Sequence, residues 1–368
     1  MSRTITIGLM SGTSLDGADA VAMAFEAGSM SRLGHAYLPF PQTLRSALMA
    51  LTSAGPDEIE RMGDASVALA RHYAAVVEKL LAEAGIARGE VAAIGAHGQT
   101  VRHRPERGFT LQINHPALLA ELTGIDVICD FRSRDVAAGG EGAPLVPAFH
   151  AECFSGDRPR AVVNVGGIAN VSALPARGAA AGTVTGGDTG PGNMLLDAWC
   201  AKTIGRPYDE NGDWARTGRV VPELLADFLS DPYFSRPFPK STGRELFSAA
   251  WLEGHLARFP GVAPEDAART ITELTAVSIA DGVRTLLPDA AELVLCGGGT
   301  FNATLREAIA AHTKARVTDT AEFGVHPMEV EGAAFAWLAE RFLERLPGNL
   351  PAVTHAAGPR ILGALYPH

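Results

Sequence analysis

The sequence predicts an α/β protein built from two lobes, and three observations support this fold class. A chain of 368 residues is too long for one ordinary core, which favours two lobes. Residues 4–25 have the pattern of strand, polar turn and strand, and residues 161–174 repeat it around Gly166 and Gly167. Long amphipathic helices separated by short apolar runs then predict sheets with helical cover.

The elements expected in the first half follow from the spacing of apolar residues and from the residues that begin or end helices and strands. An amphipathic helix is predicted over residues 64–84, because Leu69, Tyr73 and Leu80 share one face. Asp64 is expected to cap its start and Gly85 to end it. Short strands are predicted over residues 91–95, 109–113 and 125–129, with a helix over 116–122 between the last two.

The second half repeats this alternation. Strands are expected over residues 161–165, 168–174 and 292–296, and helices over residues 193–204, 264–287 and 328–346. We assign residues 1–135 and 358–368 to the first lobe and residues 136–357 to the second. The Gly- and Pro-rich stretch 139–147 lies near the boundary, and a hinge is expected around residues 130–145.

Composition narrows the functional classes. A net charge of -10 argues against a general nucleic-acid surface, since phosphate neutralisation needs clustered Lys and Arg. No apolar run reaches membrane-spanning length, and a strand pattern near residue 4 leaves no room for a signal peptide. The four cysteines are widely separated without a CxxC pair, which supports neither a zinc knuckle nor a disulfide framework and favours a reducing cytoplasm.

A polar turn near the N-terminus is the first candidate for phosphate binding. Its glycines permit a sharp turn whose backbone N–H groups can face phosphate oxygens. It is not a P-loop, since no GK[ST] follows, and an ordinary β-hairpin turn is the alternative. The candidate residues are Gly12, Thr13, Ser14, Leu15, Asp16, Gly17, Ala18 and Asp19.

Two glycine turns in the second half are further nucleotide candidates. The first follows a predicted strand and leads into a helix, where the helix N-terminus favours phosphate charge. The alternative is that its glycines only allow tight strand–helix packing. The candidates in this turn are Gly297, Gly298, Gly299 and Asn302, and those in the second turn are Asn164, Gly166 and Gly167.

Asp188 is the candidate general base. It lies in the Gly- and Pro-rich segment 186–193, which is expected to form a stiff turn immediately before a helix. A capping or Asx-turn role is the alternative. Asp197, further along the helix, is expected to be solvated or paired.

Three polar segments could contact a sugar. Gln99 and Thr100 can hydrogen-bond hydroxyl groups, Arg can fork onto a carboxylate, and Glu331 lies at a predicted helix start. One of Arg132 and Arg134 is expected to be a surface charge. His97 and His103 lack a metal partner at fixed spacing, so zinc chemistry is not indicated.

Taken in order along the chain, these segments resemble the anhydro-N-acetylmuramic acid kinases. The resemblance covers residues 8–17, 98–100, 130–135, 142–147, 164–170, 188–193, 239–245 and 296–299. It implies a two-lobed actin-like ATPase (ribonuclease H-like) fold with a central cleft for nucleotide and substrate. It also implies ATP, Mg²⁺, a small amino-sugar substrate and a homodimer.

The resemblance further implies the reaction and the roles of residues. Water opens the 1,6-anhydro ring while the γ-phosphoryl passes to O6, giving N-acetylmuramic acid 6-phosphate and ADP in cell-wall recycling. Asp188 matches the base that activates the water, and residues 12–19 match the ATP phosphate segment, with Asp16 at the metal. Gln99, Thr100, Arg134 and Glu331 match the sugar contacts, with Arg134 serving the lactyl carboxylate. Gly187 departs from the family, which often has an aromatic residue there.

Two other functions remain open from the residues. In an ordinary hexose kinase, Asp188 would deprotonate a sugar hydroxyl directly, without ring opening. A non-catalytic sugar sensor could use the same two lobes for binding, but a transcriptional sensor normally has a DNA-binding segment. No basic helix-turn-helix pattern is present in the sequence.

Overall fold

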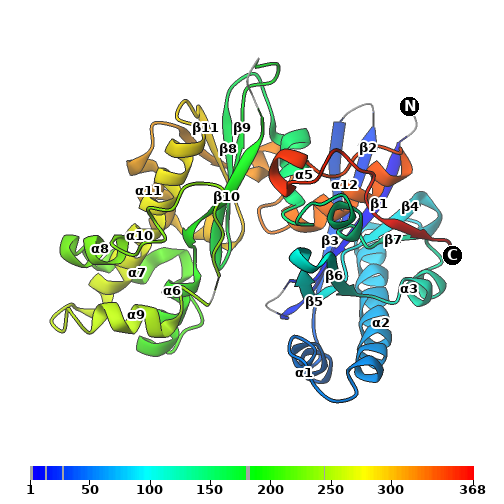
Figure 1. Cartoon of the computed structure of the whole chain (residues 1–368), viewed down its shortest axis with the longest axis horizontal. Coiled ribbons are helices and arrows are strands. Elements are labelled where there is room, and N and C mark those ends of the chain that lie inside the picture. Colours follow the sequence, from blue (N-terminus) through cyan, green and yellow to red (C-terminus); the bar gives the residue numbers. More distant parts are fainter. Residues whose placement is uncertain (1–2, 13–14, 27–28, 180–182, 244) are drawn as a thin grey trace. The chain divides into compact units, whose positions relative to one another are not determined.

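The computed structural model describes residues 3–12, 15–26, 29–179, 183–243 and 245–368. The chain divides into two compact units, Met1–Phe149 with Glu329–His368, and His150–Met328 (Figure 1). We call them the first and the second unit. Within the described part of the chain, no helix is both long enough and apolar enough to cross a bilayer.

The first unit is a six-stranded sheet with helices on both faces and a separate hairpin. The sheet order is β13-β7-β4-β1-β2-β3, and β5 pairs with β6. Its strands are β1 (Thr4–Met10), β2 (Gly17–Glu26), β3 (Ser29–Pro39), β4 (Val91–Ala96), β5 (Gln99–Arg104), β6 (Phe109–Ile113), β7 (Val127–Cys129) and β13 (Ala364–Tyr366). Its helices are α1 (Gln42–Ala50), α2 (Glu58–Ala84), α3 (Pro116–Thr123), α4 (Ser133–Ala137), α12 (Val330–Leu343) and α13 (Pro351–Thr354), and α5 (Val146–Phe154) runs across the boundary.

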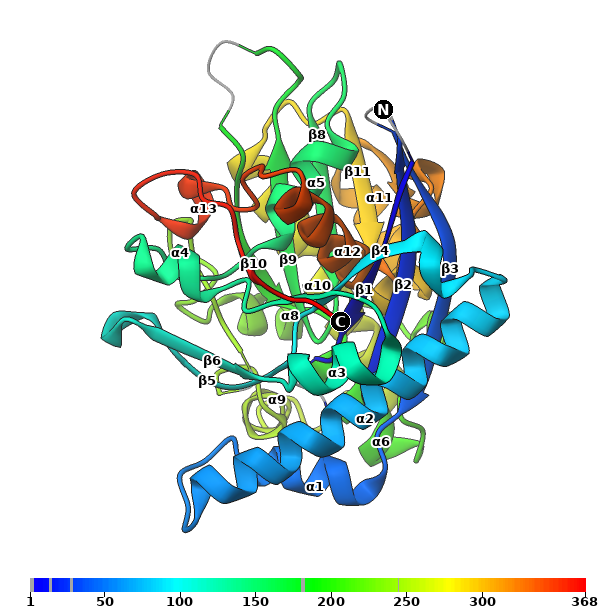
Figure 2. The ribbon, with the colours of Figure 1, turned by 90° about the vertical axis from the view of Figure 1, so that its right-hand side faces the viewer.

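The alternation of side chains along β1 explains how this sheet is covered. Ile5, Ile7 and Leu9 are buried in one core cluster with residues of α2. Figure 2 shows this long helix beside the sheet. The intervening residues face α12, since the Thr6 hydroxyl donates to the Ala336 carbonyl at 2.7 Å. A Cβ on Gly8 would lie 1.9 Å from the Gly332 carbonyl oxygen, so glycine is needed for this close approach.

The second unit is a five-stranded sheet in the order β10-β9-β8-β11-β12, with α10 packed against β9 and β10. Its strands are β8 (Arg160–Val165), β9 (Ile168–Leu174), β10 (Thr185–Pro191), β11 (Glu292–Cys296) and β12 (Arg316–Asp319). Its helices are α6 (Met194–Thr203), α7 (Asp213–Thr217), α8 (Pro222–Leu229), α9 (Ala249–Leu256), α10 (Pro264–Leu286) and α11 (Ala303–His312). Short 3-10 turns include η4 (Gly298–Phe301) and η5 (Thr320–Phe323).

The two sheets share one topology. In each unit the first three strands form an antiparallel meander, and two later strands add in parallel beside the first strand. The second unit repeats this pattern with β8, β9, β10, β11 and β12. This duplicated order is that of the ribonuclease H-like fold, so the predicted two-lobed actin-like class is confirmed.

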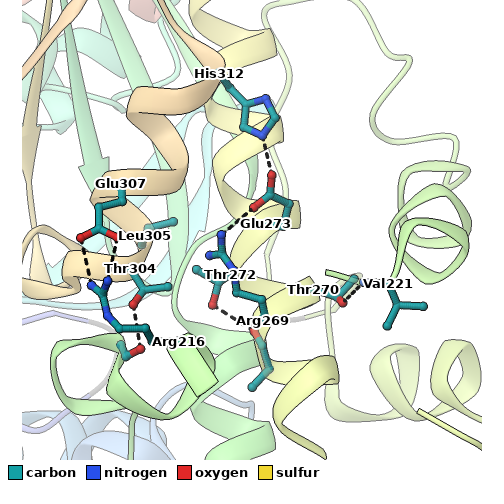
Figure 3. A network of polar contacts seen from close by, with 12 residues as sticks. Arg216, Val221, Arg269, Thr270, Thr272, Glu273, Thr304, Leu305, Glu307 and His312 are labelled. Carbon is teal, nitrogen blue, oxygen red and sulfur yellow. Dashed lines mark hydrogen bonds and ion pairs between the residues drawn. The ribbon is translucent and has the colours of Figure 1, made fainter. Parts of the chain in front are cut away.

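Ion pairs tie helices together on the second unit (Figure 3). Arg216 of α7 forms a fork onto Glu307 of α11, with distances of 2.8 and 3.0 Å. Glu273 of α10 accepts from His312 at 2.5 Å and pairs with Arg269 at 3.5 Å. These contacts link α7 and α10 to α11 away from the sheet, where they support helix packing.

Most predicted elements are present, with boundary corrections. The strands over 109–113, 168–174 and 292–296 are confirmed to the residue. The long first helix begins at Glu58 after Asp57, so Asp64 is not its cap, whereas Gly85 ends it with a positive φ of 65°. The last long helix is shorter than predicted, because it ends at Leu343 and Arg345 has a φ of 59°.

The assignment of residues to lobes also differs from the prediction. Residues 136–149 and 329–357 belong to the first unit rather than to the second. The buried Asp135 carboxylate accepts hydrogen bonds from Asn349 at 2.6 Å, Thr354 at 2.7 Å and the Gly142 N–H at 2.8 Å. Because Asn349 and Thr354 are more than 200 residues from Asp135 in sequence, local pattern could not reveal these two contacts.

Candidate active site

Asp188 lies on a strand and not on the expected turn before a helix. It belongs to β10 and pairs with Asn170 of β9, with an irregularity in register after it. Asn193 occupies the N-cap position of α6. The alternative that Asp188 caps this helix is therefore wrong.

The segment 233–242 fixes Asp188 on three sides. Its backbone N–H donates to the Lys240 carbonyl at 2.9 Å, and its own carbonyl accepts from the Tyr233 hydroxyl at 2.8 Å. The carboxylate Oδ2 accepts from the Thr242 N–H at 2.9 Å. The side chain is thus held in one orientation, as a group that acts on a bound substrate must be.

The surroundings of Asp188 make its carboxylate a stronger proton acceptor. Burial raises its pKa, the Thr242 N–H opposes this effect, and the negative charge of Glu245 adds to it. A pKa moved toward neutrality suits a general base.

The departure at Gly187 has a structural counterpart. A Cβ there would lie 2.9 Å from Cδ1 of Phe238 and 3.0 Å from the Lys240 carbonyl oxygen. The Phe238 ring therefore occupies space beside Asp188 that a side chain at position 187 would take.

In the second unit, Asn193 brings the two predicted glycine turns together. Its backbone N–H donates to Gly166 O at 2.8 Å, and its side-chain amide donates to Val165 O at 3.0 Å. Its Oδ1 lies 3.0 Å from the position of a Cβ on Gly299. Asn193 was not predicted as a site residue, although its position after Gly-Pro-Gly is a recognisable helix-start signal.

The glycines of these turns have different surroundings. A Cβ on Gly297 would lie 2.4 Å from Asn164 Oδ1, and one on Gly299 would lie 2.3 Å from Val165. In contrast, a Cβ on Gly166, Gly167 or Gly298 would meet no atom of the described residues closer than 3.5 Å. These three therefore present open backbone that a ligand can approach.

Asn302 has a structural contact as well as its predicted ligand role. It is buried and its Oδ1 accepts from the Leu305 N–H at 2.9 Å, which caps α11. Asn164 lies at the end of β8 and pairs with Asn170 across the hairpin.

The predicted phosphate segment of the first unit connects β1 to β2. Thr13 and Ser14 lie outside the described residues. Leu15 has a φ of 58°, and its side chain and that of Ala18 are buried, so both can offer a ligand only their backbone. Asp16 is 65% exposed and lies 3.8 Å from Arg45.

A buried hydrogen-bonded group supports this segment and was missed from sequence. The Ser11 hydroxyl donates to Gln99 Oε1 at 2.8 Å and bonds the Tyr73 hydroxyl at 2.7 Å. The Gln99 amide donates to Gly12 O at 3.2 Å. Gln99, predicted as a sugar contact, thus also holds the start of the phosphate segment.

Glu331 and the half-buried Arg132 carry opposite charges that influence each other, and the charge of Asp19 also acts on Glu331. Burial raises the pKa of Glu331, Arg132 lowers it, and the charge of Asp19 raises it. Burial lowers the pKa of Arg132 to about 10, while Glu331 and Asp135 oppose this shift. Arg132 donates to His97 at 3.0 Å and to Gly142 O at 2.8 Å.

Arg134 and Thr100 have different environments. Arg134 is the exposed member of the arginine pair and lies on α4, while Arg132 is half-buried. The Thr100 hydroxyl accepts from the Gln112 amide at 3.2 Å on the β5–β6 hairpin.

Comparison with known proteins identifies the family. The sequence profile of the anhydro-N-acetylmuramic acid kinases matches residues 4–368. The chain belongs to the anhydro-N-acetylmuramic acid kinase family. A relative of that name from Burkholderia orbicola strain AU 1054 is 54% identical over 99% of this chain and 96% of its own length. Another from Burkholderia pseudomallei strain K96243 is 52% identical, with 99% and 97% covered.

The family assignment makes the chain an enzyme, a kinase that uses ATP. Solved structures with partial likeness include an activator of 2-hydroxyisocaproyl-CoA dehydratase from Clostridium difficile with bound ADPNP. It is 14% identical, with 93% of this chain and 96% of that chain covered and a TM-score of 0.48. A ROK family glucokinase from Streptomyces griseus in complex with glucose and AMPPNP is 14% identical, with 92% and 99% covered and a TM-score of 0.39. These scores are low, so the fold assignment depends on the strand order of the two units.

The described residues of the chain are compatible with a bound nucleotide. Open backbone at Gly166, Gly167 and Gly298 is what close approach of phosphate or ribose requires. Among the described side chains, no group of three or more His, Cys, Asp or Glu is arranged to hold a metal. Mg²⁺ in nucleotide sites needs only one or two carboxylates beside phosphate oxygens, and the exposed Asp16 can supply one.

Proposed function

We propose that this enzyme opens the ring of 1,6-anhydro-N-acetylmuramic acid with water and phosphorylates O6. The products would be N-acetylmuramic acid 6-phosphate and ADP, in the recycling of peptidoglycan. The family assignment supports the substrate class, and the environment of Asp188 supports the hydrolytic step.

In the proposed step, the atoms and protons balance at Asp188. A water oxygen attacks the anomeric carbon C1 and gives a proton to the Asp188 carboxylate. The bond between C1 and O6 breaks. O6 then bonds to the γ-phosphorus of ATP, while the bond between that phosphorus and the ADP leaving group breaks. No covalent bond to the enzyme forms.

The observation that carries the proposal is the fixed carboxylate with a raised pKa. The Thr242 N–H holds Oδ2 at 2.9 Å, while burial raises the pKa of the group. Among the described residues, Oδ1 of Asp188 accepts no hydrogen bond, which is consistent with an oxygen kept for a water molecule. General base catalysis needs this combination of orientation and proton affinity.

Each unit by itself has residues that are proposed to contact the nucleotide. In the first unit, residues 12–19 would face phosphate oxygens, with Asp16 near the metal. Mg²⁺, when bound, would neutralise phosphate charge. In the second unit, Asn164, Gly166, Gly167, Asn302 and the turn 297–299 would hold the nucleotide, which the open backbone at Gly298 supports.

The proposed sugar contacts are Gln99, Thr100, Arg134 and Glu331. Gln99 and Thr100 are adjacent at the start of β5. The exposed guanidinium of Arg134 is available to a ligand carboxylate such as the lactyl group. The carboxylate of Glu331 can accept a hydrogen bond from a sugar hydroxyl.

The proposed function includes a homodimer in the cytoplasm, as the family resemblance suggests. The four cysteines, all free thiols, are consistent with a reducing compartment. Analytical ultracentrifugation of the purified chain tests the dimer directly.

Mass spectrometry in oxygen-18 water tests the reaction. Incubation of 1,6-anhydro-N-acetylmuramic acid with ATP and Mg²⁺ should give a product heavier by one water and one phosphate group. The label should be found at the anomeric oxygen, after a control for exchange of the free sugar. An unlabelled phosphorylated product would instead favour an ordinary hexose kinase.

A further inference from the structure

Four charged or polar side chains form a line within the first unit that ends at the predicted phosphate segment. Arg32 of β3 makes two contacts with Glu329, at 2.5 and 2.8 Å. One ring nitrogen of His35 lies 3.7 Å from Glu329 Oε1, and the other lies 2.8 Å from Asp19 Oδ1. The His35 ring thus lies between two carboxylates.

The strand register explains why His35 reaches Asp19. In the antiparallel pair β2–β3, Asp19 is opposite Tyr37, and Val21 is opposite His35. Asp19 and His35 are therefore diagonal neighbours on one face, a separation that a long or aromatic side chain can bridge. An ionised carboxylate can only accept, so the His35 Nε2–H donates to Asp19.

The other end of this line is rigid. Glu329 is 4% exposed and lies at the N-cap position of α12, where a helix N-terminus favours negative charge. The two-contact fork from Arg32 fixes its carboxylate. Asp19, at 38% exposed, keeps part of its carboxylate open to solvent while His35 holds one oxygen.

We propose that His35 is a positioning residue that holds the Asp19 carboxylate in the orientation required for nucleotide binding. This inference rests on the proposed function, since it takes Asp19 as part of the ATP phosphate segment. Glu329 orients the ring from the opposite side, and Arg32 fixes Glu329. Loss of the His35 donor frees the Asp19 side chain to rotate.

A purely structural role for this line makes a different prediction. If His35 only stabilised the β2–β3 pair, its replacement would lower the unfolding temperature and leave the affinity of the folded protein for nucleotide unchanged. The affinity is therefore the deciding quantity, measured on folded protein.

Calorimetric titration with the non-hydrolysable analogue AMPPNP, with and without Mg²⁺ and in the absence of sugar, tests the inference. His35→Phe keeps a ring but removes the donor, and His35→Gln retains an N–H group. His255→Phe is the matched control, because His255 lies 2.7 Å from Asp227 in the second unit. We expect His35→Phe to weaken binding about tenfold, as for one lost hydrogen bond to a charged group.

The supporting result has three parts. His35→Phe loses affinity, His35→Gln recovers most of it, and His255→Phe binds like the wild type. Equal affinity of His35→Phe and wild type overturns the inference, as does equal loss in His35→Phe and His35→Gln. A wild-type chain that binds no AMPPNP overturns it as well.

Failure of this inference is distinguishable from failure of the proposed function. Unchanged nucleotide affinity in His35→Phe, together with normal phosphorylation of the anhydro-sugar by the wild type, would remove only the role of His35. Reduced affinity in His35→Phe, with no sugar product from the wild type, would remove only the proposed reaction.

Discussion

Replacement of Asp188 by Asn separates catalysis from stability at one position. Asn keeps the shape of the side chain, and its Oδ1 can still accept from the Thr242 N–H that now bonds Oδ2 at 2.9 Å. The amide cannot take a proton from water. General bases contribute about 10²- to 10⁴-fold, so kcat should fall by that factor, or about 3 to 5 kcal/mol of transition-state stabilisation.

Although turnover should fall, the stability of Asp188→Asn should not decrease. Burial raises the pKa of Asp188 in the folded state, so the folded protein binds this proton more tightly than the unfolded chain does. Wild-type stability from this group therefore increases as the pH falls through the raised pKa and is lower above it. At neutral pH, Asn removes this buried charge, so the urea midpoint should stay equal or rise.

The assay combines turnover with urea unfolding at neutral pH. Asp281→Asn is the matched control, because it removes a charge that is 55% exposed in the same unit and should leave turnover unchanged. Full turnover in Asp188→Asn would refute the role of Asp188 as the base. A large loss of stability would contradict the conclusion that the buried charge of Asp188 is unfavourable to folding at neutral pH.

Three further predictions follow from contacts within the units. Gly298→Ala should keep the wild-type unfolding temperature but raise KM for ATP, because its Cβ would meet the described atoms only at ordinary van der Waals distances of 3.7 Å or more. Gly299→Ala should unfold more easily, because Val165 lies 2.3 Å from the new Cβ. Asp135→Ala should lower the free energy of unfolding in urea by about 3 kcal/mol, since three donors lose a buried acceptor; a loss near zero would contradict this. Glu245→Gln should move the acidic limb of the kcat/KM profile to lower pH, because Glu245 raises the pKa of Asp188, and a shift to higher pH would reverse that conclusion.

Several elements were predictable because their signals are local. Residues 168–174 are mostly apolar and follow the glycine pair at 166–167, and residues 292–296 are an apolar run followed by glycines; both form strands at those limits. The strand β10 was not predictable, since Thr-Gly-Gly-Asp-Thr-Gly-Pro contains few residues that favour strands. It forms because it pairs with β9 and because the segment 233–242 holds Asp188.

The same difference applies to the candidate site. The order of motifs along the chain was sufficient to indicate the family and to select Asp188, since glycine turns and carboxylates are properties of short segments. Sequence could not reveal that Gln99 holds Gly12 or that Arg132 rather than Arg134 is half-buried.

By itself, the sequence determined the fold class, the family and the chemical groups available for the reaction. The tertiary structure alone decided which partners those groups have and how strongly they hold protons. The physical reason is that the pKa of Asp188 depends on burial and on Thr242, and the orientation of Asp19 depends on His35 and Glu329. These partners are distant in sequence, so only folding brings them together.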